Sequence, residues 1–291
     1  MITEVARAKV NLTLEVIGRR PDGLHELASL VAFANIGDSV SLDTSAAVGI
    51  SVDGRFAPTL AGENLVAVTL RRLAETETRL TLGHVRLDKQ LPVAAGIGGG
   101  SADAAAVLRA VRRANPEYAV AVDWMKIAAG LGADVPVCFV SETAWMTGTG
   151  EIVLPLRGWP SLGAVLVNPL VPAPADKTAQ VFRSLSVFPP AGETGPQPPT
   201  SGQSAIDFMA SRGNNLERAA LSVMPVAAGI KTALLGIPGC RYAAVSGGGP
   251  TGVGIFDNPA IAAHILSEQE PSWWVRAVTL GGSLQLPSMS A

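Results

Sequence analysis

The sequence is poor in the residues that build disulfide frameworks and metal centres. Its 291 residues include two cysteines and three histidines. Cys138 and Cys240 both lie in apolar surroundings, where a buried free thiol is favoured over a disulfide or a metal ligand. His25, His84 and His264 are far apart and do not have the spacing of metal ligands. The composition therefore argues against a disulfide scaffold and gives no sign of a cysteine or histidine metal centre.

Long apolar runs and an excess of positive charge are also missing. No stretch approaches the roughly 18 to 20 continuous apolar residues of a membrane span, and residues 1–11 contain no apolar core of signal-peptide length. The net charge is −2 and the pI about 6.0, which gives no electrostatic footprint for nucleic acid. We therefore expect a cytoplasmic protein with a small-molecule partner and no membrane or nucleic-acid partner, either monomeric or a weak homodimer.

Lysine is scarce. Of the 22 basic residues only five are lysines, at positions 9, 89, 126, 177 and 231. Arginine is thus the default cation of this chain, and a lysine on a polar face near a cleft is a candidate for a specific role.

Glycine, by contrast, is abundant and is concentrated before one alanine-rich run. The stretch LPVAAGIGGGSADAAAVLR occupies residues 91–109, with glycines at 96, 98, 99 and 100. Glycine adopts positive φ and lets a ligand approach the backbone, and the first turn of a helix presents unpaired N–H groups. This junction predicts an anion site suited to phosphate. The alternative is a tight corner that needs glycine only for its geometry.

Two familiar phosphate-binding loops do not fit this stretch. The P-loop requires Gly-Lys before Ser or Thr, and no Gly-Lys pair occurs in the chain. The dinucleotide fingerprint would need glycine where Ser101 stands, and it usually follows the first strand of a domain. A dehydrogenase with a dinucleotide-binding fold is therefore disfavoured.

The residues after the glycines have the spacing of a helix. One apolar stripe recurs at i, i+3, i+4 and i+7 and consists of Ala104, Val107, Leu108 and Val111. We expect Ser101 to cap the start of this helix, Asp103 to lie in its first turn, and Asn115-Pro116 to stop it.

The N-terminal segment from Val5 to Val16 alternates like a strand. One face carries Val10, Leu12, Leu14 and Val16, and the other carries Lys9, Asn11, Thr13 and Glu15. The ammonium of Lys9 and the amide of Asn11 should therefore point the same way. A solvated strand face is the alternative to a functional one.

Two further loops are candidates for a site. Asp134 stands between the helix-ending Gly132 and Val135-Pro136, in irregular backbone near a helix end, where a capping or turn role is the alternative. A second glycine cluster spans Ser246 to Gly252. It predicts either a hairpin turn or a loop that closes on the first site from another domain.

The remaining pattern predicts an α+β chain with two domains. An antiparallel start is expected, with a turn at Gly37-Asp38, a helix over 63–74, a strand over 85–89, a helix over 123–129 and a hairpin over 145–156. Strands over 164–167, 242–245, 253–256 and 275–280, separated by helices, predict an α/β sandwich of the split βαβ kind. We place the domains at 1–160 and 161–291. The proline-rich segment 187–204 is expected to be a mobile surface insertion.

Taken in order, these motifs resemble those of the GHMP kinases, the superfamily of galactokinase, homoserine kinase, mevalonate kinase and phosphomevalonate kinase. The segments that carry the likeness are Ala8–Leu12, Asp22–His25, Leu91–Ser101, Gly132–Pro136, Asn214–Glu217 and Ser246–Gly249. The resemblance implies the GHMP kinase fold, with an N-terminal ribosomal protein S5 domain 2-like domain and a C-terminal ferredoxin-like α/β sandwich. More narrowly, the chain resembles the branch that phosphorylates the 2-hydroxyl of a cytidine-diphosphate-linked methylerythritol in the non-mevalonate route to isoprenoid precursors.

The resemblance also implies roles for residues. The ATP phosphates would be held by Pro92, Val93, Ala94, Ala95, Gly96, Ile97, Gly98, Gly99, Gly100, Ser101 and Ala102. Lys9 and Asp134 would be the catalytic pair, and Asn11, His25 and Asp134 would contact the acceptor substrate. Mg²⁺ is implied by the chemistry without identifiable ligands, Ser101 being only a candidate.

Some positions depart from the pattern of this branch. Leu24 stands where tyrosine is common, which removes a ring that could stack on cytosine. Ala94 and Ala95 replace a more glycine-rich entry, and Gly248 replaces a small polar residue. Two other interpretations stay open: another small-molecule GHMP kinase of the homoserine or mevalonate type, and a nucleotide-binding protein without catalysis.

Overall fold

One long strand organises the first half of the chain. In the computed structural model, which describes residues 1–57, 64–174, 176–185, 188, 199 and 201–282, β3 (His25–Asp43) is continuous. Four strands pair with β3, all of them antiparallel to it: β1 (Ile2–Asn11), β2 (Glu15–Arg19), β5 (His84–Asp88) and β6 (Ala144–Gly148). β4 (Gly49–Asp53) pairs parallel with β5, and β7 (Ile152–Pro155) forms the expected hairpin with β6. The antiparallel start is confirmed.

Two expectations about these strands were wrong. The segment from Val5 to Val16 is not one strand, because β1 ends at Asn11 and β2 begins at Glu15. Gly37-Asp38 is not a turn but lies within β3. The pairing of β1 with β3 slips there, since Arg7 is opposite Gly37 while Lys9 is opposite Phe33. Glycine is required at 37 because an added Cβ would clash with the main chain of Ala6.

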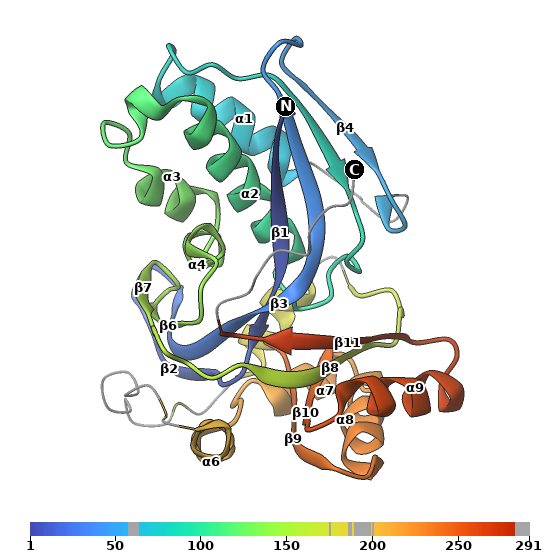
Figure 1. Ribbon diagram of the computed structural model, residues 1–291. Coiled ribbons are helices and arrows are strands. Elements are labelled where there is room, and N and C mark those ends of the chain that lie inside the picture. The colour runs from blue at the N-terminus through green and yellow to red at the C-terminus, as the bar shows by residue number, and fades with distance from the viewer. Residues whose placement is uncertain (58–63, 175, 186–187, 189–198, 200, 283–291) are drawn as a thin grey trace.

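Four helices cover one face of this sheet (Figure 1). They are α1 (Leu65–Thr76), α2 (Gly99–Ala114), α3 (Trp124–Leu131) and α4 (Val135–Val140), and a short 3₁₀ turn, Pro116–Tyr118, follows α2. Apart from α4, which was not foreseen, these helices match the expected ones. Among the described residues, no helix has both the length and the apolar character needed to cross a membrane.

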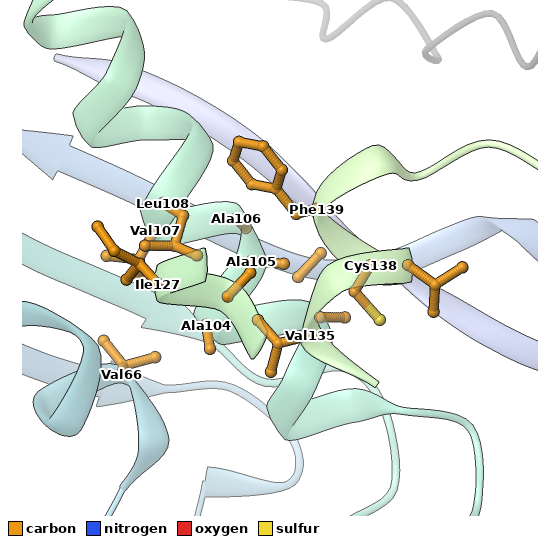
Figure 2. Close-up of a cluster of buried hydrophobic side chains, with 14 of the residues drawn as sticks. Val66, Ala104, Ala105, Ala106, Val107, Leu108, Ile127, Val135, Cys138 and Phe139 are labelled. Carbon is orange, nitrogen blue, oxygen red and sulfur yellow. The ribbon is translucent and has the colours of Figure 1, made fainter. Parts of the chain in front are cut away.

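Helix α2 lies at the centre of the core. Its predicted stripe is buried, but so are Ala105 and Ala106 on its other sides, in the same buried cluster as Val135 and Cys138 of α4 and Val66 of α1 (Figure 2). Alanine has no side chain beyond Cβ, so α2 can approach its neighbours closely on several sides. The single stripe read from the sequence was therefore too narrow a description of the helix.

The start of α2 also differs from the expectation. The residue that precedes the helix is Gly98 in the left-handed conformation, and no side chain caps the first turn. Ser101 is therefore the third residue of the helix rather than its cap, and Asp103 lies beyond the first turn. The consequence is that the main-chain N–H groups of this turn are not used by a capping side chain.

The second half has the predicted split βαβ arrangement. Four antiparallel strands lie in the order β11-β8-β10-β9: β8 (Leu162–Asn168), β9 (Cys240–Val245), β10 (Gly252–Phe256) and β11 (Trp274–Leu280). Helices α8 (Val226–Gly236) and α9 (Pro259–Gln269) pack on this sheet (Figure 1). Between β8 and α8 lie α5 (Lys177–Arg183), α6 (Gly202–Arg212) and α7 (Glu217–Val223).

The two halves share one hydrophobic cluster. Leu30 and Ala32 of β3 belong to the same buried cluster as Ala164 and Leu166 of β8, and β11 also pairs with β3 at one position. The division into domains at residue 160 stays a prediction. The two halves of the chain are packed together through apolar side chains.

The expected insertion and thiols need small corrections. Residues 201–204 are not part of an insertion, because Ser201 and Ser204 form a capping box at the start of α6. Within the rest of segment 187–204, residues 187, 189–198 and 200 lie outside the described residues. Both cysteines are free thiols, but only Cys138 is buried and Cys240 is partly exposed.

Candidate active site

The glycine loop before α2 has a backbone that other residues would not adopt easily. Gly96 and Gly98 have φ values of 78° and 68°, and Ala94 lies in the same left-handed region with φ 55°. A Cβ on Gly96 would lie 2.6 Å from the carbonyl oxygen of Gly249, and one on Gly98 would lie 3.0 Å from Cβ of Lys9. The two glycines are needed because the loop passes this close to its neighbours.

Strand β1 and the second glycine cluster hold this loop in place. The amide of Lys9 donates to the carbonyl of Ile97 at 2.9 Å, and the amide of Thr251 donates to the carbonyl of Ala95 at 3.1 Å. The hydroxyl of Ser246 donates to the carbonyl of Gly96 at 3.0 Å. The cluster at 246–252 connects β9 to β10 and also packs on the first loop. It is therefore both the expected turn between two strands and the expected loop that closes on the first one.

Lys9 and Asp134 meet beside the loop. The Lys9 ammonium lies 2.9 Å from Oδ2 of Asp134 and donates to Oδ1 of Asn11 at 3.0 Å. The side chain of Lys9 is 4% exposed, whereas that of Asp134 is 36% exposed. Asp134 precedes α4 but makes no capping hydrogen bond with it. The solvated strand face is excluded for Lys9, which is buried. Asp134 does lie in a turn before α4, as its alternative expected, but it does not cap that helix.

Asn11 is itself held by a chain of hydrogen bonds. Its side-chain nitrogen, Nδ2, donates to the hydroxyl of Ser29 at 2.8 Å, and that hydroxyl donates to the main-chain carbonyl of Thr13 at 2.6 Å. Asn11 is 4% exposed. Because its carbonyl oxygen is directed at Lys9, this amide positions the ammonium, a function that the sequence pattern did not suggest.

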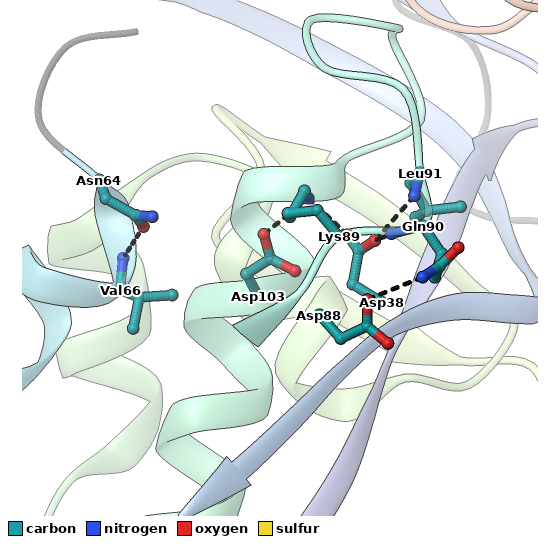
Figure 3. Close-up of polar contacts among 8 residues, drawn as sticks. All are labelled: Asp38, Asn64, Val66, Asp88, Lys89, Gln90, Leu91 and Asp103. Atoms are coloured by element: carbon teal, nitrogen blue, oxygen red, sulfur yellow. Dashed lines mark hydrogen bonds and ion pairs between the residues drawn. The ribbon is translucent and has the colours of Figure 1, made fainter. Parts of the chain in front are cut away.

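A second lysine lies under the start of α2. Lys89, 1% exposed, donates to Oδ2 of Asp103 at 2.8 Å and to Oδ2 of Asp38 (Figure 3). Oδ1 of Asp38 accepts hydrogen bonds from the amides of Gln90 and Leu91 at 2.6 and 2.8 Å. The sequence analysis did not predict this group of Asp38, Lys89 and Asp103. The scarcity of lysine in the chain was the observation that could have pointed to Lys89.

The two carboxyl groups around Lys89 share one ammonium. Burial raises the pKa of Asp103 to about 8, and neighbouring Asp38 adds to the rise while Lys89 opposes it. Oδ1 of Asp103 is buried and has no partner in the described structure. Since two buried carboxylates would leave a net negative charge, a proton on Asp103 lowers the cost of burying the group.

His25 lies among aromatic side chains at the other side of the site. Its ring centroid is 4.9 Å from that of Phe182 in α5 and 6.1 Å from that of Phe188. Burial lowers the pKa of His25 below its ordinary value, and the positive charge of Arg19 contributes to the same effect. Leu24, the departure noted above, is 54% exposed. Phe182 and Phe188 were not identified from the sequence.

These groups line one cavity of about 1130 Å³. Its walls include Lys9, Asn11, His25 and Asp134, residues 92–96 and 98–101 of the loop, and Gly247 and Gly248 of the second cluster. Ile97 and Ala102 do not line it, because their side chains are buried in the core. A cavity for one drug-sized ligand typically measures about 300–1,000 Å³, so this one is slightly larger than that range.

The described residues offer no protein-only metal site. No group of three or more His, Cys, Asp or Glu side chains among them is placed to hold a metal ion. His84 donates to or accepts from Ser51, and His264 lies near Glu268 on an exposed helix face. Neither histidine lines the cavity, so we assign neither of them a role in the site.

Comparison with known proteins identifies the relatives of this chain. The GHMP kinases N terminal domain family matches residues 64–142. A protein of Parvibaculum lavamentivorans named 4-diphosphocytidyl-2-C-methyl-D-erythritol kinase is 43% identical over 293 residues, covering 97% of this chain and 99% of the relative. A protein of the same name from Rhodopseudomonas palustris is 43% identical and covers 96% of this chain and 99% of the relative.

Solved structures give the same result. A crystal structure of 4-(cytidine 5'-diphospho)-2C-methyl-D-erythritol kinase superposes with a TM-score of 0.74 at 31% identity, covering 97% of this chain and 100% of the other. Homoserine kinase from Cytophaga hutchinsonii has a TM-score of 0.66 at 18% identity, with 97% and 96% covered. The second likeness concerns the fold alone.

Proposed function

This chain belongs to the 4-diphosphocytidyl-2-C-methyl-D-erythritol kinases of the GHMP kinase superfamily, and from that membership we propose that it transfers the γ-phosphoryl group of ATP to the 2-hydroxyl of 4-diphosphocytidyl-2-C-methyl-D-erythritol. It is an ATP-dependent small-molecule kinase with a GHMP kinase fold. The observation that carries the proposal is the meeting of the glycine loop, Lys9 and Asp134 in one cavity. A non-catalytic nucleotide-binding protein would not need an acid and a cation in contact at this point.

ATP fits the loop at the start of α2. The main-chain N–H groups of the first turn have no capping side chain, and an added Cβ on Gly100 would meet nothing within 4 Å. A phosphate could therefore approach this backbone closely and lie at the positive end of the helix dipole. The proposed phosphate site extends over residues 92–102, although Ile97 and Ala102 do not line the cavity and the amide of Ala102 already donates to the carbonyl of Gly98.

Asp134 is proposed to accept the proton of the attacking hydroxyl. Phosphoryl transfer passes through a loose transition state, so catalysis consists mostly of positioning and charge stabilisation. The carboxylate of Asp134 is partly exposed to the cavity and is held by Lys9 at 2.9 Å. As the new phosphorus–oxygen bond forms and ADP leaves, the hydroxyl proton passes to Asp134, and Lys9 offsets negative charge on the transferring group.

The acceptor is proposed to extend through the cavity from Asp134, which its hydroxyl must reach, towards His25. His25 and Asn11 are the residues expected to contact its cytidine and diphosphate parts. The rings of His25, Phe182 and Phe188 provide flat apolar surfaces for a base, and Phe182 and Phe188 line the same cavity. The rings of Phe182 and Phe188 come from a segment far from Leu24 in the sequence, and they offer a stacking surface that Leu24 does not.

Mg²⁺ is proposed to enter with the nucleotide. Magnesium in kinase sites is usually bound by one or two carboxylates together with substrate phosphates, and it keeps several waters. The described residues do not fit a site that the protein alone would form, and the carboxylates near the loop are engaged by Lys9 and Lys89. No step of the mechanism is therefore assigned to the ion.

A panel of acceptors tests the proposed function. The protein would be incubated with ATP and, separately, the cytidyl methylerythritol substrate, homoserine and mevalonate, and products would be followed by ³¹P NMR. We expect ADP and a new phosphomonoester signal with the cytidyl substrate only. A new phosphomonoester with homoserine or mevalonate instead would overturn the acceptor assignment, and no product with any acceptor would overturn the kinase assignment.

Location and assembly also stay proposals. We propose a cytoplasmic enzyme that is a monomer or weak homodimer. Cell fractionation and analytical ultracentrifugation at several protein concentrations would test these two statements.

A further inference from the structure

Lysine is used selectively in this protein. Of its five lysines, three line the cavity: Lys9, Lys89 and Lys177. All three are buried, with 3%, 1% and 5% of their surface exposed. Burying an ammonium is unfavourable unless it is paired, so each of these lysines calls for an explanation.

Two of the three have carboxylate partners and the third does not. Lys9 contacts Asp134, and Lys89 contacts Asp38 and Asp103. Lys177 forms no ion pair within the part of the chain that the structure describes. Its neighbour Asp176 is taken up by Arg183, 2.7 Å away on the surface. Lys177 is therefore the cavity lysine whose charge no described residue matches.

The contacts of Lys177 are two main-chain carbonyls from separate loops. Its ammonium donates to the carbonyl of Ala94 at 2.9 Å and to the carbonyl of Gly249. Ala94 belongs to the proposed phosphate loop and has the left-handed φ of 55°, and Gly249 belongs to the second glycine cluster. An ammonium has three N–H donors. Two of them join the loops, which leaves one donor and the full charge without an oppositely charged acceptor among the described residues.

We propose that Lys177 neutralises a polyphosphate group bound in the cavity while it holds the two glycine loops together. The inference rests on the proposed function, because both proposed substrates carry such a group: the triphosphate of ATP and the diphosphate of the cytidyl acceptor. Burial lowers the pKa of Lys177 to about 8, as expected for an ammonium that lacks an anionic partner until a ligand supplies one. Lys177 is thus a binding residue of the site and not a part of the fold alone.

Calorimetric titration of binding to the full chain tests this inference. The ligands are ATP and adenosine for one substrate, and cytidine 5'-diphosphate and cytidine for the other. The variants are Lys177→Met, which removes the charge and the donors, and Lys177→Gln, which removes the charge but keeps two N–H donors. Lys126→Met, at an exposed lysine outside the cavity, is the matched control.

We expect both Lys177 variants to bind one of the two nucleotides about 10- to 100-fold more weakly, the range for loss of one charge-assisted contact. The corresponding nucleoside should bind as it does to the wild type, and the affected nucleotide identifies which polyphosphate Lys177 meets. Lys177→Arg should restore most of the affinity. Lys126→Met should bind every ligand like the wild type.

Two results would overturn the inference. Unchanged affinity of Lys177→Gln for both nucleotides would show that the charge is not used, and equal losses for nucleotide and nucleoside would show that Lys177 only holds the loops. Should Lys177→Met fail to fold, Lys177→Gln and Lys177→Arg still decide the matter. A wild-type protein that binds neither nucleotide would contradict the proposed function itself, which separates the two failures.

Discussion

Two lysine–carboxylate contacts line the same cavity and differ in how they are enclosed. Lys9 lies 2.9 Å from Asp134, and Lys89 lies 2.8 Å from Asp103. The side chain of Asp134 is 36% exposed, whereas that of Asp103 is 4% exposed. The carboxylate of the first contact is therefore open to a ligand in the cavity, whereas the second contact, with Asp38 behind it, lies almost fully covered in the cavity wall under the start of α2. The proposed function assigns chemistry to the first contact, whereas the burial of the second favours a structural role.

The difference in enclosure predicts different consequences of losing each lysine. Removing one partner of a buried ion pair typically costs about 3–5 kcal/mol, because a charge is left buried without compensation. A carboxylate that still reaches solvent does not incur this cost. Variants at the two lysines should therefore separate activity from stability, and the following predictions test that separation from the largest effect to the smallest.

Of the two lysine variants, Lys9→Met should have the larger effect on turnover. Loss of a cation that stabilises charge in the transition state typically lowers kcat by about 10²–10³. Asp134 remains in contact with solvent, but the buried Oδ1 of Asn11 loses its donor, so the free energy of unfolding should fall by about 1–3 kcal/mol, less than for the Lys89 variant. Steady-state kinetics and urea unfolding of the same preparation measure both quantities. A wild-type kcat would contradict the proposed role of Lys9. A loss of stability as large as that of the Lys89 variant would contradict the difference between the two contacts.

Lys89→Met should act mainly on stability. Asp38 and Asp103 would be left facing each other in the core, and we expect the free energy of unfolding to fall by about 3–5 kcal/mol. Denaturant titration measures this, and Lys126→Met, an exposed lysine, should change stability by less than about 0.5 kcal/mol. An effect of Lys89→Met as small as that of the control would contradict the structural role of the group.

Gly96→Ala tests the loop that both contacts adjoin. The added Cβ would lie 2.6 Å from the carbonyl oxygen of Gly249, at a residue with φ 78°, so the free energy of unfolding should fall by about 1–3 kcal/mol. Gly130→Ala in α3, where an added Cβ meets nothing within 4 Å, should instead be neutral or stabilise by up to about 1 kcal/mol. Equal effects of the two substitutions in thermal unfolding would refute the close approach of the loops.

The smallest expected effect is a titration. Because burial and Arg19 lower the pKa of His25 below 6.5, the fold favours the neutral imidazole. The stabilisation from His25 is therefore present above pH 6.5 and is lost as the pH falls through the lowered pKa. An NMR titration of the ring, assigned with His25→Asn, measures it directly. A pKa of 6.5 or higher would show that the ring is not enclosed as described.

Local patterns in the sequence predicted most of the elements and much of the site. The alternation around Lys9 and Asn11 placed both side chains on one face, and the glycine loop before α2 was evident because few other residues accept its backbone. The strand order of the second half followed from the spacing of strands and helices. These features depend on neighbours in the sequence, which a single sequence displays.

The features that were missed depend on contacts between distant segments. Gly37 looked like a turn residue. It is glycine because the main chain of Ala6 in β1 passes so close that a Cβ would not fit. Ser101 looked like a cap, but the helix begins earlier, at Gly99. The partners of Lys89 are Asp38 and Asp103, 51 and 14 residues away. No spacing rule relates such positions, so only the fold could bring them together.

The most direct measurement of the central claim is a single-turnover experiment with Asp134→Asn. The amide keeps the shape of the side chain and an oxygen for Lys9, but it cannot accept the hydroxyl proton. We expect phosphoryl transfer from ATP to the cytidyl acceptor to slow by about 10²–10⁴, while ATP binding and the midpoint of unfolding stay close to those of the wild type. Transfer at the wild-type rate would contradict the claim that Asp134, Lys9 and the glycine loop act together on one phosphoryl group.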